Sequence, residues 1–404
     1  MACFRGIGTL SSRLLKICDL TQFYSPVSGG VRRYIEQKSA YLRACRPDCE
    51  HVIIVPGETT GHSGDARVRN YTIASPLVSR TSRYRALTRL HLIEEVLEKE
   101  RPDIIESGDP YQVAWKAVAS GRGLDIPVVG FYHSHFPESY MRTIAKYFGR
   151  VAVAITDDIC RRYVRTLYNA FQCTFVPSPA LGRLLAAWGV ERLHTVDLGV
   201  DAAVFVPGIP DRDGTRKRLG VPQDAWLLLY VGRMAPEKNV RTLFDAFAIL
   251  HARSPGRFHL LCAGDGSQRQ SLVRLQEATG AVHWIPYCTD PMELASIYRA
   301  ADLFVHPGVQ ETFGLVALES QASGTCVVGI RGSYMDRIIF SDQEFWAAEN
   351  SPAALADAIK SKFTLDLRAA GLKASTEARG KYSWSTVFSR IFEIYSGVIA
   401  NFSR

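Results

Sequence analysis

The sequence lacks any long hydrophobic run. A membrane-spanning helix needs about 20 consecutive, mostly apolar residues, and the best apolar runs here, at 226–231 and 151–155, are far shorter and flanked by polar residues. The N-terminal segment contains no unbroken apolar stretch of the kind that directs secretion. We therefore expect neither an integral membrane protein nor a secretory signal.

Paired cysteine motifs and a strong charge imbalance are absent as well. The nine cysteines are scattered without a CxxC spacing, and a chain of 404 residues needs no disulfide to stabilise its core, so we expect free thiols in a reducing cytoplasm. The net charge of +8 comes from 48 Lys and Arg against 40 Asp and Glu. This surplus is compatible with nucleic acid, anionic lipid or a phosphorylated small molecule, and does not choose among them. With 47% hydrophobic residues, the chain as a whole is not disordered.

Short apolar runs alternate with longer segments of helical period in both halves of the chain, which predicts buried parallel strands linked by helices. The predicted strands cover 14–18, 52–55, 104–105, 127–132, 151–155, 174–176, 193–197, 226–231, 259–263, 282–285, 303–306, 326–329 and 345–347. A Pro- and Gly-containing segment at 205–214 suits a linker. The expected fold class is α/β, with two doubly wound domains at 1–204 and 205–383 and an amphipathic helix in 384–404.

Ligands of open parallel sheets bind beyond the carboxyl ends of the strands, so the informative residues should follow strands. Gly29 and Gly30 come after the first strand and before a helix, where paired glycines let the backbone approach an anion closely. A plain strand-to-helix turn explains the same residues. The next two basic residues, Arg32 and Arg33, suit a phosphate or lipid contact, or simply solvent.

A second glycine turn carries two cations. Gly232 and Arg233 directly follow the predicted strand 226–231, and Lys238 lies five positions beyond Arg233. An Arg that binds phosphate through two nitrogens and a Lys that acts as a point charge make an anion clamp near a helix start. The alternative is a surface turn with a solvated Glu237–Lys238 pair.

Two glutamates follow the predicted strand 303–306. Glu311 lies in the loop and Glu319 in the second turn of a helix predicted over 315–322, so both carboxylates lie near the same mouth. Carboxylates suit sugar hydroxyls because each accepts several hydrogen bonds, and the backbone N–H groups at 313–315 suit a phosphate or a hydroxyl. Helix capping is the alternative for Glu311. A solvated helix face is the alternative for Glu319, although its apolar sequence neighbours argue against it.

Two further features are weaker. His133 and His135 share one side of the segment that ends the strand 127–132, but no third metal ligand is placed by the sequence, so we predict no metal and favour a hydrogen bond from His133 to substrate. Gly264 begins a GxG after the strand 259–263. This turn lacks the third glycine of a dinucleotide-binding loop and fits a nucleotide-proximal loop or a bare turn.

Together these segments resemble the family-four glycosyltransferases of the GT-B fold, which are retaining enzymes that use nucleotide sugars. The resemblance runs nearly end to end and is carried by FYSPVSGGVRRYI, FYHSHFPESY, FVPSPAL, LGVDAAVF, VGRMAPEKN, HPGVQETFGLVALES and KYSW. FYHSHFPESY is similar to the histidine segment of the mannosyl- and sulfoquinovosyl-type branch. Two segments depart from the family pattern, since 329–334 lacks a glycine pair and 197–201 lacks the Asn before Gly-Val-Asp.

The resemblance implies roles for individual residues. Arg233 and Lys238 would hold the donor diphosphate, Glu311 the hydroxyls of the transferred sugar, Glu319 the nucleotide ribose, and His133 would lie near the sugar and acceptor. The implied catalytic residues are His133, Arg233, Lys238 and Glu311, and the implied donor-binding residues are Gly29, Gly30, Gly232, Gly264, Thr312, Phe313, Gly314, Leu315 and Glu319. The resemblance also implies that the terminal helix crosses back onto the first domain.

The predicted function is transfer of a hexose from a nucleotide-diphosphate sugar to a glycan, lipid or small-molecule acceptor. GDP-mannose is slightly preferred over a UDP-sugar, on the FYHSHFP segment alone. Because Arg, Lys and helix ends can stabilise the leaving diphosphate, no cofactor is required. A catalytically silent nucleotide-sugar sensor and a dinucleotide-dependent oxidoreductase are the alternatives, while nucleic acid is not expected as a partner.

Basic residues cluster in two regions of the first domain: Arg80, Arg83, Arg85 and Arg89 in one, and Arg142, Lys146, Arg150, Arg161, Arg162 and Arg165 in the other. A basic helix face suits an anionic membrane surface, and a solvated face explains it equally well. The expected location is the cytoplasm, with peripheral contact at the inner membrane face left open.

Overall fold

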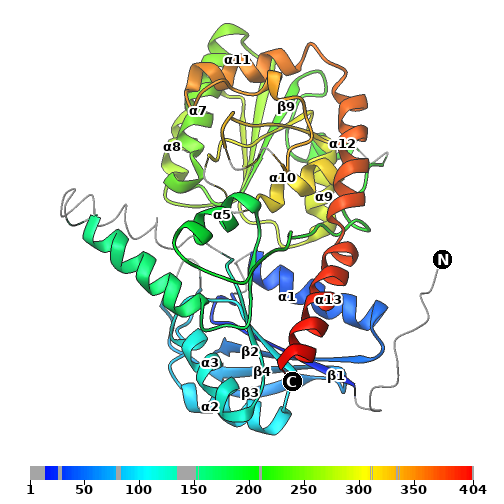
Figure 1. Ribbon diagram of the computed structural model, residues 1–404. Helices are drawn as coiled ribbons and strands as arrows, with labels where there is room; N and C mark the ends of the chain where they lie inside the picture. Colours follow the sequence, from blue (N-terminus) through cyan, green and yellow to red (C-terminus); the bar gives the residue numbers. More distant parts are fainter. Residues whose placement is uncertain are drawn as a thin grey trace.

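Two open sheets lie one above the other in the computed structural model (Figure 1). The predictions for Gly29, Thr312 and His135, and for the basic residues Arg80, Arg142, Lys146 and Arg150, fall outside the residues that the structure describes. These described residues are 14–25, 30–78, 83–133, 152, 154–208, 212–309, 311, 313–333, 335 and 337–402.

The first domain is built on eight strands in the order β3-β4-β2-β1-β5-β6-β7-β8. Every neighbouring pair is parallel except β3–β4, as expected for strands connected by helices. The strands are β1 (Leu15–Leu20), β2 (Cys49–Gly57), β3 (Gly61–Gly64), β4 (Val68–Ala74), β5 (Ile104–Ser107), β6 (Val128–Phe131), β7 (Thr174–Val176) and β8 (Leu193–Thr195). The helices are α1 (Gly30–Cys45), α2 (Leu90–Glu100), α3 (Gln112–Leu124), one over 154–168, and α5 (Pro179–Ala187).

The second domain has a wholly parallel sheet in the order β11-β10-β9-β12-β13. Its strands are β9 (Trp226–Val231), β10 (Phe258–Ala263), β11 (Val282–Ile285), β12 (Leu303–Val305) and β13 (Cys326–Val328). Its helices are α6 (Arg212–Arg218), η1 (Pro236–Lys238), α7 (Val240–Arg253), α8 (Arg269–Thr279), α9 (Pro291–Ala300), α10 (Leu315–Ala322), η2 (Gln343–Phe345), α11 (Pro352–Lys362) and α12 (Leu367–Tyr382).

Each sheet reverses its strand order at one point. In the first sheet β1 lies between β2 and β5, and in the second β9 lies between β10 and β12. A crevice forms at such a point because the connections on its two sides leave in opposite directions, and ligands of doubly wound sheets bind there. The loops after β1, β5, β9 and β12 are therefore the places to look for a site.

The last helix, α13 (Trp384–Phe402), leaves the second domain and packs against α1 of the first (Figure 1). Its buried hydrophobic face includes Val387, Phe388, Ile391 and Phe392. At about 1.5 Å per residue, its 19 residues run for about 28 Å along the first domain.

A buried ionic cluster lies under this contact and consists of Asp19, Lys38, His51, Glu106 and Tyr395. The Lys38 ammonium lies 2.8 Å from a carboxylate oxygen of Asp19 and 3.1 Å from one of Glu106. His51 Nε2 is 2.5 Å from the other oxygen of Asp19, and the Tyr395 hydroxyl donates to Glu106. Because buried charges are costly unless paired, these contacts fix α13 to the core of the first domain.

Two predicted strands are wrong. The expected strand 345–347 begins at the end of the 3-10 helix η2 (Gln343–Phe345), and only Ala347 pairs, in one isolated bridge with Ile330. Residues 154 and 155 of the expected strand 151–155 are helical and continue to 168. A short apolar run does not distinguish a strand from a helix, and here the (i, i+4) pairs Asp157–Arg161 and Asp158–Arg162 favour the helix. Ile155 is also 58% exposed rather than buried in a sheet.

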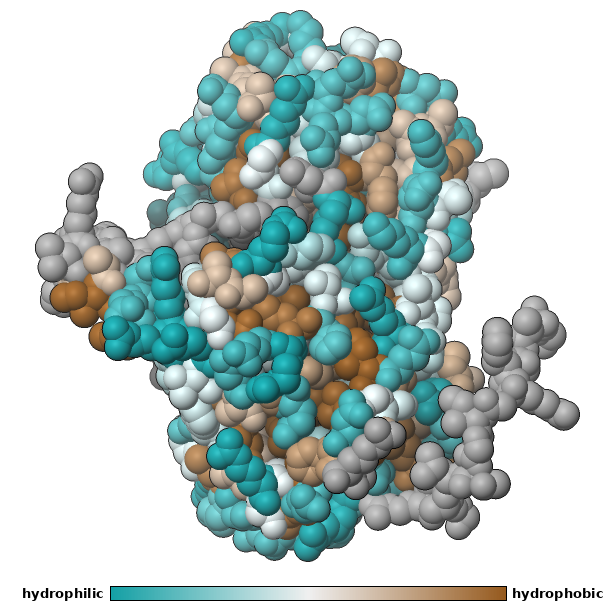
Figure 2. Space-filling view, viewed as in Figure 1, coloured by the Kyte–Doolittle hydropathy of each residue, from teal (hydrophilic) through white to brown (hydrophobic). Residues whose placement is uncertain are grey.

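The helix over 154–168 projects from the body of the molecule (Figure 1). Hydrophobic residues lie near the end of this projection (Figure 2), where Ile155 and Ile159 are both exposed. None of the helices among the described residues is both long and apolar enough to cross a bilayer.

Candidate active site

The loops after β9 and β12 meet through two of the predicted catalytic residues. Lys238 ends η1, beyond β9, and its ammonium lies 2.6 Å from a carboxylate oxygen of Glu311, beyond β12. The side chains are 31% and 16% exposed, so the pair is half-buried and still reached by solvent. An ammonium has three donors, which leaves Lys238 able to bind an anion while it holds Glu311.

Asn239 holds these two loops together, a role that we did not predict. Its backbone has φ 56°, a left-handed conformation that Asn tolerates better than most residues. Its side-chain amide donates to the backbone carbonyl of Pro307 at 2.8 Å and to the side chain of Asn350 at 2.7 Å. The sequence does show an Asn between a 3-10 turn and a helix. It gives no hint of the contact, because the Pro307 carbonyl that Asn239 binds lies 68 residues away.

Gly264 supports the same mouth through its backbone. A Cβ atom at this position would lie 2.1 Å from the carbonyl oxygen of Gly232, far inside van der Waals contact. The loops after β10 and β9 therefore approach so closely that only glycine fits at Gly264. This geometry gives the GxG turn a packing role. The nucleotide contact of Gly264 stays a prediction.

Arg233 lies at the exposed rim of this mouth. Its side chain is 63% exposed and its guanidinium lies 2.8 Å from the carboxylate of Glu237, four residues on. No ion pair that the structure describes joins it to Lys238 or Glu311. An exposed pair of this kind contributes little to stability, so Arg233 can exchange Glu237 for another anion at small cost.

His306 lies beneath the Glu311 loop and was not predicted as a site residue. It follows β12 directly, and a Cβ atom at Gly308 would lie 3.0 Å from its ring carbon Cε1. Burial lowers the pKa of His306, and the Lys238 charge lowers it further, against the opposite effect of Glu311. The imidazole of His306 is therefore neutral at pH 7, close enough to the Lys238–Glu311 pair for both charges to act on it.

Glu319 lies in α10 with both carboxylate oxygens engaged. Arg33 of α1 pairs with Oε1, and the hydroxyl of Tyr298 donates to Oε2 at 3.0 Å. The side chain is 2% exposed, which confirms that it does not lie on a solvated helix face. Gly314, directly before α10, has φ 89°, and a Cβ atom there would lie 2.2 Å from the Met335 side chain.

Two more predicted residues complete this wall. Phe313 is buried between Tyr382 and the guanidinium of Arg337, whose carbon Cζ lies 5.2 Å from the Phe313 ring centre. Leu315 begins α10 and faces α1, since a Cβ atom at Gly30 would lie 4.0 Å from its Cδ1. The two helices that follow β1 and β12 therefore meet, which brings the predicted residues Gly30 and Leu315 of the two domains together.

His133 follows β6 on the first-domain side. Its ring stacks on Phe131 with the centres 3.9 Å apart, and it meets the edge of Tyr34 at 5.3 Å. Burial lowers the pKa of His133 to about 3, with a smaller contribution from the positive charge of Lys38. The imidazole is therefore neutral at pH 7, which suits a hydrogen-bonding role and excludes a standing positive charge there.

Asp109, after β5, is a polar residue that we did not predict. It is fully buried, and its carboxylate accepts hydrogen bonds from the backbone N–H groups of Gln22 at 3.0 Å and Tyr111 at 3.4 Å. Burial raises the pKa of Asp109 to about 6, although these hydrogen bonds act against the shift. The residue ties the loop after β1 to the loop after β5, at the point where the strand order reverses.

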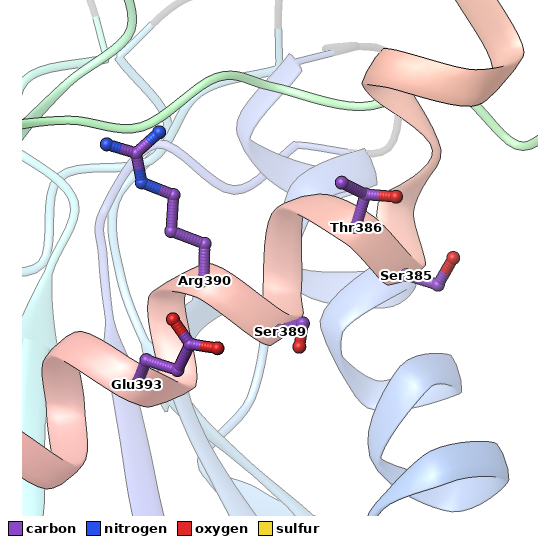
Figure 3. Close-up of a pocket in the computed structure, with 5 residues that line it drawn as sticks. All are labelled: Ser385, Thr386, Ser389, Arg390 and Glu393. Carbon is purple, nitrogen blue, oxygen red and sulfur yellow. The ribbon is translucent and has the colours of Figure 1, made fainter. Parts of the chain in front are cut away.

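A separate hollow lies along α13, with a volume of about 570 Å³. The labelled side chains in Figure 3, Ser385, Thr386, Ser389, Arg390 and Glu393, all come from this one helix. None of the predicted site residues lines it. Over the described ranges, no three His, Cys, Asp or Glu side chains are grouped to hold a metal ion.

Comparison with known proteins identifies the class. Residues 28–204 match the family described as Glycosyltransferase Family 4, and residues 211–376 match Glycosyl transferases group 1. A curated GDP-mannose-dependent α-(1-6)-phosphatidylinositol dimannoside mannosyltransferase of Mycobacterium tuberculosis is 30% identical over 86% of this chain and 87% of its own. A GDP-mannose-dependent α-mannosyltransferase of Corynebacterium glutamicum is 27% identical over 96% of this chain and 90% of its own.

Solved structures agree on the fold. Sucrose-phosphate synthase from Thermosynechococcus elongatus superposes with a TM-score of 0.73 at 19% identity, covering 96% of this chain and 100% of its own. HepE of Anabaena, in complex with UDP and glucose, gives a TM-score of 0.71 at 17% identity, covering 95% and 100%. The protein is a glycosyltransferase of the GT-B fold. Within that class, the chain belongs to glycosyltransferase family four.

Proposed function

We propose that the chain is a retaining mannosyltransferase that transfers mannose from GDP-mannose to a glycan, lipid or small-molecule acceptor. The observation that carries this proposal is the alignment along nearly the whole chain with two relatives whose names specify GDP-mannose as donor. Both domains are included in these alignments, so the donor side and the acceptor side are matched together.

The geometry supports separate contacts for the diphosphate and for the transferred sugar at the mouth between the domains. Lys238, Arg233 and the N-terminus of α10 would stabilise the negative charge of the leaving diphosphate, which is the largest catalytic contribution in reactions of this kind. Glu311, held by Lys238, would accept hydrogen bonds from hydroxyls of the transferred sugar. Retention would proceed by attack on the same face through an oxocarbenium-like state, with His133 as a neutral hydrogen-bond partner.

A screen of GDP- and UDP-sugars for binding and slow hydrolysis tests the donor and the reaction together. We expect GDP-mannose to give the highest turnover. Arg233→Ala should lower turnover while Arg241→Ala, which breaks an equally exposed (i, i+4) pair with Asp245, should not. Equal losses in the two variants would remove Arg233 from the donor site, and turnover of a UDP-sugar alone would overturn the choice of GDP-mannose.

A UDP-sugar transferase is the second candidate. A sulfoquinovosyl transferase of Arabidopsis thaliana, whose name does not specify GDP-mannose, is 31% identical over 74% of this chain and 58% of its own length. The FYHSHFP segment resembles the sulfoquinovosyl-type members of the branch as well as the mannosyl-type members. The same donor screen separates the two, because only the second candidate predicts preferential turnover of a UDP-sugar.

Peripheral membrane contact is a further part of the proposal. The projecting helix over 154–168 combines the exposed Ile155 and Ile159 with Arg162, which is 72% exposed. Its pairing with Asp158 reduces the positive charge that we expected there. Binding to anionic phosphatidylglycerol vesicles should exceed binding to neutral phosphatidylcholine vesicles and fall when salt rises from about 0.1 M to about 0.5 M. Equal binding to both would reject the contact.

A further inference from the structure

Glu319 has no room for a further partner in the described arrangement. Its carboxylate is 2% exposed, Tyr298 donates to Oε2 from a fully buried position, and Arg33 pairs with Oε1. A ribose presents two neighbouring hydroxyls, and each needs an acceptor oxygen that it can reach. A carboxylate that is covered on all sides cannot supply one unless a neighbour moves.

The neighbour that can move is Arg33. Tyr298 lies on α9 of the same domain as Glu319 and is 0% exposed, whereas Arg33 reaches over from α1 of the first domain and is 28% exposed. Helices α1 and α10 also approach each other at Gly30, where a Cβ atom would lie 4.0 Å from Cδ1 of Leu315. Arg33 thus bridges the two domains at the carboxylate that the family resemblance assigns to the nucleotide.

We propose that Arg33 is a positioning residue that competes with the nucleotide ribose for Glu319, so that donor binding requires this interdomain ion pair to open. The inference rests on the proposed function and on the ribose contact that the resemblance implies for Glu319. A ligand that binds only the open arrangement has its apparent affinity reduced by the fraction of molecules that are open. Removing Arg33 should therefore strengthen nucleotide binding, which is the opposite of what a direct phosphate ligand would do.

The test measures the binding of GDP and of UDP to the full chain by calorimetry. Arg33→Met keeps the length of the side chain and removes the charge. We expect the dissociation constant of the better nucleotide to fall about tenfold, which corresponds to a pair that is closed in about nine molecules of ten. Arg33→Lys restores a cation and should return the affinity to within about threefold of the wild type.

The ratio of the changes in KM and kcat gives a second readout, which a purely structural role of Arg33 would leave unchanged. In donor hydrolysis, Arg33→Met should lower the KM for the sugar nucleotide about tenfold while kcat stays within about twofold, because the pair is absent once the donor is bound. A rise in KM would show that Arg33 binds the donor directly, and it would overturn the inference.

Arg337→Met is the matched control. Arg337 also bridges the domains, pairing with Asp197 and the backbone carbonyl of Pro177. Its guanidinium lies against Phe313, and no described contact joins it to Glu319. An equal gain in affinity from Arg337→Met would mean that general loosening of the domains is responsible, and would overturn the role of Arg33. Unchanged nucleotide affinity in Arg33→Met would also overturn the role of Arg33, but it would leave the proposed nucleotide-sugar function intact. If neither nucleotide bound the wild type or Arg33→Met, the inference and the proposed function would fail together.

Discussion

Lys38→Met is the sharpest test of what fixes the last helix to the first domain. Methionine has nearly the length of lysine but no charge, so the substitution removes the ammonium and leaves little empty space. The Lys38 side chain is 0% exposed, with Asp19 at 2.8 Å and Glu106 at 3.1 Å, and it donates to the Tyr395 hydroxyl at 3.0 Å. The variant therefore buries the charge of Asp19 without its main partner.

The expected cost follows from that burial. Removing one partner of a buried ion pair typically costs about 3–5 kcal/mol, because the remaining charge is neither hydrated nor compensated. In a domain of about 200 residues, 1 kcal/mol shifts Tm by about 2–4 °C. The unfolding transition of the first domain should therefore fall by about 6–20 °C, measured by circular dichroism.

The pH dependence of this loss has a definite sign. Burial alone would raise the pKa of Asp19, but Lys38 and His51 hold it well below its usual value. In the wild type its stabilising contribution is thus present above pH 4 and is lost only in stronger acid. In the variant, Asp19 and Glu106 both lose the pKa-lowering effect of Lys38, and burial already raises the pKa of Glu106 to about 7 in the wild type. Keeping these buried carboxylates ionised therefore costs the variant more stability as pH rises. The difference in Tm should be wider at pH 8 than at pH 5.

The matched control is Lys116→Met. Lys116 pairs with Glu94, which is 43% exposed, and its own side chain is 17% exposed. Because solvent compensates both groups, the same substitution should cost less than about 1 kcal/mol and show little dependence on pH. An equal loss at both sites, or a gap for Lys38→Met that stays constant between pH 5 and pH 8, would refute the reasoning.

Three further outcomes are expected. Lys238→Met should lower kcat/KM for transfer at least about 100-fold in steady-state assays while Tm stays within about 2 °C, and full activity would remove Lys238 from the mechanism. Gly264→Ala should destabilise the second domain by about 2 kcal/mol or more in thermal unfolding, because its Cβ would lie 2.1 Å from the Gly232 carbonyl oxygen; an unchanged Tm would contradict the close approach. Tyr395→Phe removes the hydroxyl that serves Glu106 and should cost about 1–3 kcal/mol in denaturant unfolding, whereas a neutral effect would mean that water replaces it.

Much of the second domain was predictable from local pattern. The strand 226–231, the strand 282–285 and the helix 315–322 were predicted with the bounds that the structure gives them. These segments are bounded by turns, and 226–231 and 315–322 are mostly buried, so their sequence alone carries the signal. By contrast, β4 (Val68–Ala74) mixes polar and apolar residues near the edge of its sheet, next to β3. Neither of these strands was predicted.

The residues of the candidate site also fall into those that local sequence predicts and those that only the tertiary structure reveals. Lys238 and Glu311 were predicted because each follows a strand, and the structure joins them directly. The sequence did not decide among a phosphate, a lipid and solvent as the partner of Arg33. Its actual partner Glu319 lies 286 residues away, and only the packing of the two domains brings them together. Asp109 was missed because a carboxylate that binds backbone N–H groups leaves no spacing pattern in the sequence.

The path of α13 also determines when the first domain can be completed during synthesis. Its hydrophobic face and Tyr395 close the core of a domain whose other elements leave the ribosome before the second domain does. Until α13 emerges, the side of α1 that carries Lys38 stays without its cover, and Glu106 lacks the Tyr395 hydroxyl. Co-translational folding from the N-terminus, which many two-domain chains use, can therefore be only partial here. A chain that stops early would present this uncovered surface to proteases and chaperones.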